Sequence, residues 1–275
     1  MSRTLLIDAD IIAYQTSASN EVRVDWEGDG NLAVAADFEA AQRAAKETID
    51  GFVEELKATD VVICLSDDFD NFRKDFYPAY KSNRHSTQRP EHLYDMKEWL
   101  AANYPHRLIK RLEADDVMGI LSTEPHKGDR IIVSADKDMQ TIPGLLFNPN
   151  KDMDVRVILP EKAEQFLFWQ AITGDQTDGY PGCPGAGPLA AGKLLKGIGY
   201  ERYTHFFKSG PRKGIGEQRW RDIDLGCRWK AIVSAYEKAG LGEADAVVQV
   251  NLARILKHGE WDGKRVIPWE PPRAD

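Results

Sequence analysis

Short apolar runs that end in acidic residues recur in the first half of this chain and constrain its fold. The segments TLLIDAD, DVVICLS and RIIVSAD read as strands buried on both faces of a parallel sheet. Stretches with apolar residues at helical spacing lie between them, at about 37–56 and 91–103. This alternation predicts an α/β fold, with a central, mainly parallel sheet flanked by helices.

The pattern changes after Pro160. EKAEQFLFWQAI, CRWKAIVSAYEKAG and EADAVVQVNLARIL are all helix-like, and we expect no strand between them. We therefore predict an α/β domain over residues 1–160, a helical region over 161–260 and a tail over 261–275. The Gly-, Lys- and Arg-rich stretch 208–221 is expected to be a loop, either solvated or in contact with phosphate.

Composition narrows the class of protein. The chain has 275 residues, of which 42% are hydrophobic and 29% charged, as in ordinary globular domains. No apolar run approaches membrane-spanning length, and the N-terminus meets an acidic residue too early for a signal peptide. Three cysteines without CxxC spacing fit a reducing cytoplasm and argue against a thiolate zinc site.

Carboxylates gather where an α/β sheet presents residues to a ligand, at the carboxyl ends of its strands. Nine of them fall in five clusters: Asp8, Asp67, Glu113, Asp115, Asp116, Asp136, Asp138, Asp175 and Asp178. A single Asp after a strand is more often a helix cap or turn residue, but five clusters together favour a shared anionic pocket. Such a pocket requires divalent cations, and two Mg²⁺ ions suit in-line phosphoryl transfer. Removing nine negative charges from the net charge of −8 leaves +1, so the acidity does not exclude a nucleic-acid partner.

Asp10 follows the first strand in a DxD pattern. It is either a further metal ligand or the N-cap of the next helix. We leave both alternatives open and do not include Asp10 in the metal set.

A basic and aromatic segment, NFRKDFYPAYKSNRHSTQRPEH, follows the second strand. Its candidate DNA contacts are Arg73, Lys74, Tyr77, Tyr80, Lys81 and Arg84. Cations that neutralise phosphates, interspersed with rings that stack on bases, are typical of proteins that bind single-stranded ends. The alternative is a solvated, mobile loop whose aromatic residues pack beneath it.

A glycine-rich segment, GYPGCPGAGPLAAGKLL, precedes another helix. Gly182, Gly185 and Gly187 allow a tight turn whose backbone N–H groups can face a phosphate. The GxPGxG pattern before AAGKLL indicates a hairpin that grips duplex backbone without reading sequence. A Walker P-loop is excluded because the chain has no GK[ST].

Taken in order, FRKDFYPAYKSNR, EADD, SADKDMQ and TGDQTDGYPGCPGAG resemble the flap endonuclease/5′→3′ exonuclease family, and most closely its bacteriophage branch. The resemblance runs from about Leu5 to Leu256. It implies a PIN-like, resolvase-like 5′-nuclease core, an arch over about 73–107 and a helix–three-turn–helix over Gly179–Leu195. The implied activity is metal-dependent 5′→3′ exonuclease and structure-specific 5′-flap endonuclease cleavage of DNA 5′ ends, flaps and RNA primers, in replication or recombination.

The resemblance also implies residue roles. One Mg²⁺ or Mn²⁺ group matches Asp8, Asp67, Glu113, Asp115 and Asp116, and the other matches Asp136, Asp138, Asp175 and Asp178. Lys81, beside Tyr80, is expected to contact the scissile phosphate. The implied catalytic set is Lys81, Asp8, Asp67, Asp115 and Asp136. Family members bind duplex backbone at the helix–three-turn–helix with help from a K⁺ ion.

The implied partners are DNA with 5′ ends, flaps or nicks, RNA primer–DNA hybrids, and a separate DNA polymerase. We expect a monomer in the cytoplasm of a bacterial or phage-infected cell. The chain differs from the family pattern at two positions expected to help position the phosphate. Gln15 stands where family members often have Arg, and Pro188 follows GxG where several have Lys. Lys193 or Lys196 is expected to substitute for that lysine.

Two rival hypotheses remain. In a haloacid-dehalogenase-like phosphatase Asp8 would be the nucleophile and Asp10 an acid/base, but EADD and GCPGAG would have no explanation, and Ile11 stands where Thr or Val is expected. A DNA-junction binding protein with an inactive site is the non-catalytic alternative. The presence of all nine carboxylates argues against it.

Overall fold

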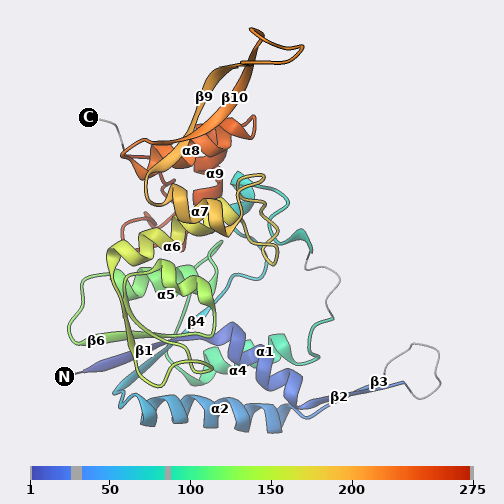
Figure 1. Cartoon of the computed structure of the whole chain (residues 1–275). Coiled ribbons are helices and arrows are strands. Elements are labelled where there is room, and N and C mark those ends of the chain that lie inside the picture. The colour runs from blue at the N-terminus through green and yellow to red at the C-terminus, as the bar shows by residue number, and fades with distance from the viewer. Residues whose placement is uncertain (1, 26–32, 84–87, 273–275) are drawn as a thin grey trace. The chain divides into compact units, whose positions relative to one another are not determined.

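The computed structural model describes residues 2–25, 33–83 and 88–272, and it divides into two compact units (Figure 1). Unit 1 comprises Met1–Phe72, His85–Ala163 and Ile255–Ile267. Unit 2 comprises Arg73–Arg84, Glu164–Arg254 and Pro268–Asp275. In the part of the chain that is described, no helix has the length and apolarity needed to cross a bilayer.

Unit 1 is built on a six-stranded sheet with the order β5-β4-β1-β6-β7-β8. Its strands are β1 (Arg3–Asp8), β4 (Asp60–Leu65), β5 (His106–Leu108), β6 (Asp129–Val133), β7 (Gly144–Phe147) and β8 (Arg156–Ile158). All neighbours pair in parallel except β7 and β8, which are antiparallel. In register, Leu6 lies between Val62 and Ile132. The expected central, mainly parallel sheet is confirmed.

Helices cover both faces of this sheet. They are α1 (Ala9–Ser19), α2 (Phe38–Glu55), α4 (Leu93–Asn103), α5 (Ala114–Thr123) and the 3₁₀ helix η2 (Lys137–Thr141). Figure 1 shows α1, α2 and α4 on one side of the sheet and α5 on the other. On α2, Ala41, Ala45 and Ile49 form the buried stripe that its helical spacing predicts. The strands β2 (Glu21–Val24) and β3 (Ala33–Ala36) pair as an antiparallel hairpin after α1.

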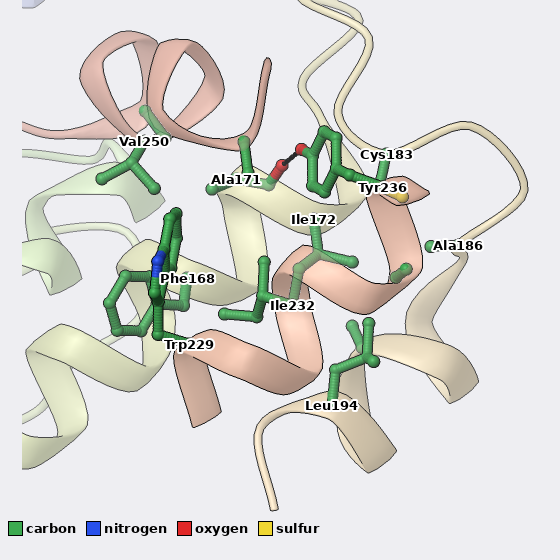
Figure 2. Close-up of a cluster of buried hydrophobic side chains, with 14 of the residues drawn as sticks. Phe168, Ala171, Ile172, Cys183, Ala186, Leu194, Trp229, Ile232, Tyr236 and Val250 are labelled. Atoms are coloured by element: carbon green, nitrogen blue, oxygen red, sulfur yellow. Dashed lines mark hydrogen bonds between the residues drawn. The ribbon is translucent and has the colours of Figure 1, made fainter. Parts of the chain in front are cut away.

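Unit 2 packs α3 (Arg73–Phe76), α7 (Pro188–Leu194), α8 (Arg228–Lys238), α9 (Glu243–Ala253) and most of α6 (Pro160–Thr173) around an apolar core. Figure 2 shows Phe168 and Ile172 beside Trp229 and Ile232 in this core. The Tyr236 hydroxyl donates a 2.7 Å hydrogen bond to the Ala171 carbonyl, so the one polar atom of that ring is satisfied. These helices confirm the mainly helical C-terminal region.

The expectation that the C-terminal half contains no strand is wrong. The strands β9 (Ile198–Phe206) and β10 (Gly216–Asp224) form a long antiparallel hairpin, and β10 begins inside the stretch 208–221 that was expected to be a loop. The hairpin is solvated along most of its length and so carries no apolar run. Without such a run, the pattern that identifies a buried strand is absent, and cross-strand pairing defines the element instead.

Candidate functional site

Asp8 is the last residue of β1 and the N-cap of α1. Its carboxylate accepts a hydrogen bond from the Ile11 backbone N–H (3.3 Å) and one from the Ser134 hydroxyl (2.9 Å). The side chain is almost completely buried, at 5% exposed. The first strand therefore ends in a carboxylate that is fixed from two sides.

The pKa of Asp8 is raised to about 7, first by burial and then by the neighbouring charge of Asp10, against the lowering effect of the Ser134 and Ile11 hydrogen bonds. Asp136 also raises this pKa. The pKa of the Cys64 thiol is raised by burial and then by the charges of Asp8, Asp115 and Asp10. The carboxylates at the ends of β1 and β6 and at the start of α5 thus share one electrostatic environment.

The loop after β4 is held by Asp67. One carboxylate oxygen accepts from the Phe69 N–H (3.0 Å), and the other accepts from the Arg111 N–H (2.7 Å). Because Arg111 lies just before α5, Asp67 links the carboxyl end of β4 to the EADD segment.

The three acidic residues of the EADD segment have different environments. Glu113 is the N-cap of α5, and its N–H donates to Asp116 (3.2 Å). Asp116 is fully buried, and its other oxygen accepts from the Leu256 N–H (3.1 Å). Asp115 and Glu113 are partly exposed. Asp116 therefore has a clear structural role in unit 1, and its assignment as a metal ligand stays a prediction.

The SADKD segment forms a tight turn after β6. Asp136 caps η2 by accepting from the Asp138 N–H (2.8 Å), and its own N–H donates to the Ser134 hydroxyl (3.1 Å). Ser134 consequently connects the Asp136 turn to Asp8. Sequence reasoning missed this residue, although its position between a strand and an Asp cluster is a usable signal.

Asp10 lies in the first turn of α1 and is not its cap, so that alternative is wrong. Its Oδ1 is buried and lies 3.0 Å from Lys97 Nζ, but it accepts no well-directed hydrogen bond. Lys97 also contacts Asp68 at 2.6 Å. The DxD pattern alone did not place Asp10 in the predicted metal set. The structure places Asp10 in the electrostatic environment of Asp8, with the buried ammonium group of Lys97 beside it.

The chemistry of these donors fits a hard divalent cation. All are carboxylate oxygens, Asp8 is buried with a raised pKa, and Asp10 has a buried oxygen that accepts no well-directed hydrogen bond. Among the described residues, however, no three His, Cys, Asp or Glu side chains are close enough together to hold an ion. Ionised carboxylates repel one another in the absence of a cation, and this repulsion opposes a closed ligand set. The ligand set therefore stays a prediction.

Unit 2 carries the remaining two carboxylates and the predicted catalytic lysine. Asp175 accepts from the Thr177 (2.7 Å) and Asp178 (3.2 Å) N–H groups. Asp178 accepts from the Tyr80 hydroxyl (2.8 Å), and Lys81 Nζ lies 3.7 Å from its other oxygen. The Lys81 N–H donates to the Asp178 carbonyl (2.8 Å). The Tyr80–Lys81 pair and the TGDQTD segment thus form one connected cluster.

Several predicted DNA contacts have other roles. Arg73 is only 2% exposed, and its guanidinium donates to the carbonyls of Leu252 (3.1 Å) and Arg254 (2.7 Å) at the end of α9. Its assignment as a DNA contact is therefore wrong for this conformation, because its donors are used inside unit 2. The Tyr80 ring is also buried and cannot stack on a base. Lys74 is exposed and Tyr77 is partly buried, whereas Arg84 lies outside the described residues.

In the glycine-rich segment, too, some of the predicted DNA contacts are buried and others are exposed. Gly182 is buried, has φ of +67°, and donates its N–H to Gln249 (2.9 Å), so it cannot present that group to a phosphate. Gly185 and Gly187 are exposed, and Gly187 is the N-cap of α7. Of the two lysines on and after α7, Lys193 pairs with Asp222 (2.7 Å), and Lys196 is exposed.

Comparisons with known proteins show the family and the fold. Residues 3–155 match the family model described as the 5′-3′ exonuclease, N-terminal resolvase-like domain. Over 97% of its length the chain is 31% identical to the exodeoxyribonuclease of Enterobacteria phage T3 and 30% identical to the exonuclease of Escherichia phage T7, covering 92% and 93% of those proteins. A similar fold is found in the crystal structure of the phage T5 flap endonuclease, a pseudo-enzyme-product complex with DNA and metal ions. The TM-score is 0.53 and the sequence identity 18%, and the match covers 70% of this chain and 74% of that one. These matches favour the nuclease hypothesis over the phosphatase hypothesis.

Proposed function

The chain belongs to the 5′-3′ exonuclease family and is a nuclease, and we propose that it uses Mg²⁺ or Mn²⁺ to cleave phosphodiester bonds at DNA 5′ ends and flaps. The observation that carries the metal assignment is the shared environment of Asp8, Asp10, Asp115 and Asp136 at the sheet edge. A buried carboxylate with a pKa near neutrality is stabilised in its charged form by a cation. The relative from phage T5 was crystallised with DNA and metal ions.

When bound, divalent cations neutralise charge on the phosphodiester and lower the pKa of water. The residues of the chain have separate roles. Ser134 and the Ile11 N–H orient the Asp8 carboxylate, and the Arg111 and Phe69 N–H groups orient Asp67. Fixed ligands of this kind reduce the reorganisation needed when a cation binds.

Lys81 is proposed to hold its ammonium group against the scissile phosphate and to stabilise charge that develops on the phosphoryl oxygens. The local geometry around Lys81 supports this proposed role. The backbone of Lys81 has φ of +55° and donates to the Asp178 carbonyl, so the chain direction at this residue is fixed. Tyr80 holds Asp178 by its hydroxyl, and Asp178 lies 3.7 Å from the ammonium group.

Duplex binding is proposed for the exposed part of the glycine-rich segment, at Gly185, Gly187 and Lys196, with a K⁺ ion assisting there. Exposed backbone N–H groups and a nearby cation bind phosphate without reading bases. We extend the proposal to 5′ ends of RNA primers on DNA, to action as a monomer, and to work beside a separate polymerase.

The test uses a 5′-flap duplex and a nicked duplex, each labelled at the 3′ end of the cleaved strand, with Mg²⁺ titrated from zero. We expect metal-dependent shortening of the strand by the wild-type protein and at least a 100-fold loss of rate in Asp136→Ala. Asp154→Ala, in an acidic position outside all five clusters, is the matched control. Equal cleavage by wild type and Asp136→Ala, or tight junction binding that is never followed by cleavage, would contradict the proposal.

A further inference from the structure

The hairpin of β9 and β10 is the largest feature of unit 2 that the proposed site does not use. Nine residue pairs join the two strands, from Ile198–Asp224 to Phe206–Gly216. At about 3.3 Å per residue such a ribbon is about 30 Å long. Its base is packed: Gly199 lies against Ala231 of α8, and the Tyr200 N–H donates to Ser234 (2.9 Å). Figure 1 shows the ribbon continuing past α8.

The distal part of this hairpin, residues 202–221, is strongly basic. It contains one acidic residue, Glu217, and six basic residues: Arg202, Lys208, Arg212, Lys213, Arg219 and Arg221. Its net charge is +5 within a chain of net charge −8. The other acidic residues of the hairpin, Glu201, Asp222 and Asp224, lie at its base. Charge is therefore segregated along the ribbon, with the excess of cations at the free end.

Aromatic rings hold the arginines on one face of the ribbon. Arg212 Cζ lies 3.9 Å from the centroid of the Phe207 ring, and Arg219 Cζ lies 5.3 Å from it. Arg221 Cζ lies 5.2 Å from the centroid of the Tyr203 ring. The rings themselves are supported edge to face through His205, at 5.2 Å from Phe207 and 6.4 Å from Tyr203. Stacked guanidinium groups lose rotamer freedom before a ligand arrives.

Ion pairs within the hairpin neutralise only part of the positive charge of its arginines. Glu217 contacts both Arg212 and Arg219, so one carboxylate is shared by two guanidinium groups. Arg221 pairs with Glu201 at the solvent-exposed edge. The side chains of Arg212, Arg219 and Arg221 remain 56%, 41% and 59% exposed. Each guanidinium has five donors, more than these partners accept.

We propose that residues 202–221 bind the phosphate backbone of duplex DNA independently of sequence, as a contact additional to the glycine-rich segment. The inference rests on the proposed function for its choice of DNA. The high positive charge selects a polyanion. The rings of Tyr203 and Phe207 are occupied by guanidinium groups and are poorly placed to stack on unpaired bases, which favours duplex over single strand. A two-stranded ribbon also has the dimensions of an element that docks in a DNA groove.

The experiment compares three variants with the wild type by fluorescence anisotropy, using blunt 20-base-pair duplexes of two unrelated sequences, in EDTA, over a range of KCl concentrations. The first variant, R212Q/R219Q/R221Q, removes the stacked arginines. The second, K208Q/K213Q, changes only turn residues outside the strand pairs, so that it tests charge without disturbing the ribbon. The control, R43Q/K46Q/K151Q, removes three exposed charges from unit 1. Circular dichroism and thermal melting check that each variant is folded.

For the arginine variant we expect affinity for both duplexes to fall about 10- to 100-fold at low salt, with the slope of log K against log [KCl] reduced by about 2 to 3. The lysine variant should lose about 5-fold in affinity and about 1 to 2 in slope. The control should bind like wild type. Unchanged duplex affinity and slope in both hairpin variants would overturn the inference, as would a loss confined to one of the two sequences. Flap cleavage by the wild type with Mg²⁺ tests the proposed function separately, so failure of one does not imply failure of the other.

Discussion

The Ser134 hydroxyl donates a hydrogen bond of 2.9 Å to the Asp8 carboxylate, although the two residues are 126 positions apart in the chain. The same hydroxyl accepts from the Asp136 N–H at 3.1 Å. One small side chain thereby connects the carboxyl ends of β1 and β6, which are neighbours in the sheet. Two carboxylates of the proposed metal site are thus positioned by a residue that is not itself a ligand.

Loss of this hydroxyl should weaken metal binding. Ser134→Ala leaves Asp8 buried with one donor fewer, so its pKa should rise further and its charged form should be less stable. We expect about a 10-fold higher Mg²⁺ concentration for half-maximal cleavage, since residues that orient ligands contribute about 10- to 100-fold to metal affinity. Ser122→Ala, which removes a hydroxyl bonded to the Gly119 carbonyl on α5, is the control. An unchanged Mg²⁺ titration would show that Ser134 does not position Asp8.

The metal-free protein should lose stability as pH rises because of Asp8. Its pKa is raised from 3.8 to about 7 in the folded state, so the folded protein binds this proton more tightly than the unfolded chain does. The contribution of protonated Asp8 to the free energy of unfolding is fully present below about pH 4 and is lost as the pH rises through 7. The loss is on the order of 2–4 kcal/mol.

Asp8→Asn keeps a good helix cap and has no charge to bury, so it should remove this pH dependence in EDTA. Urea denaturation at pH 5 and pH 8 measures the difference. Mg²⁺ should restore stability at pH 8 in the wild type but not in the variant. If the two proteins have parallel stability profiles in EDTA, the raised pKa of Asp8 is refuted.

Lys81 should affect chemistry more than binding. Lys81→Ala removes the ammonium group while Tyr80 and Asp178 keep their hydrogen bond. Single-turnover cleavage of a 5′-flap duplex should slow about 100- to 1,000-fold, as is typical when one charge-stabilising group is removed. Lys74→Ala, an exposed lysine in the same segment, should change the rate less than 3-fold, which is within about 0.6 kcal/mol. Equal effects of the two substitutions would mean that Lys81 contributes only general attraction.

Arg73 should behave as a structural residue. Arg73→Ala leaves the carbonyls of Leu252 and Arg254 without these donors in a buried environment. We expect a loss of about 2–4 kcal/mol in the free energy of unfolding, measured by urea denaturation, with duplex affinity unchanged under conditions where the protein is folded. A fully stable Arg73→Ala protein with weakened DNA binding would restore Arg73 as a DNA contact.

The two glycines Gly182 and Gly185 should differ in their tolerance of a side chain. Both have positive φ, at +67° and +76°, but a Cβ on Gly182 would lie 2.3 Å from the Gly174 backbone nitrogen, whereas Gly185 faces open space. Gly182→Ala should therefore cost about 3 kcal/mol or more and Gly185→Ala about 1 kcal/mol. Thermal melting of both variants makes the comparison, and similar melting temperatures would contradict the packing described around Gly182.

The sequence by itself determined the α/β class and the placement of carboxylates at the ends of β1, β4 and β6. Buried parallel strands have a recognisable local composition, and the topology of such a sheet brings their carboxyl ends to one edge. The order of the motifs also indicates the family, which the match of residues 3–155 to the family model confirms. These features depend on residues close together in the chain.

Only the tertiary structure decided which candidates are used for packing. Arg73, Asp116 and Gly182 have the residue types expected of a functional site, yet each one forms hydrogen bonds to a distant segment, at Leu252, Leu256 and Gln249 respectively. Asp10 showed the opposite behaviour, because burial beside Lys97 gives it a place near Asp8 that the DxD pattern left open. Burial and hydrogen-bond partners far along the chain are set by how the elements pack, so no local pattern in the sequence specifies them.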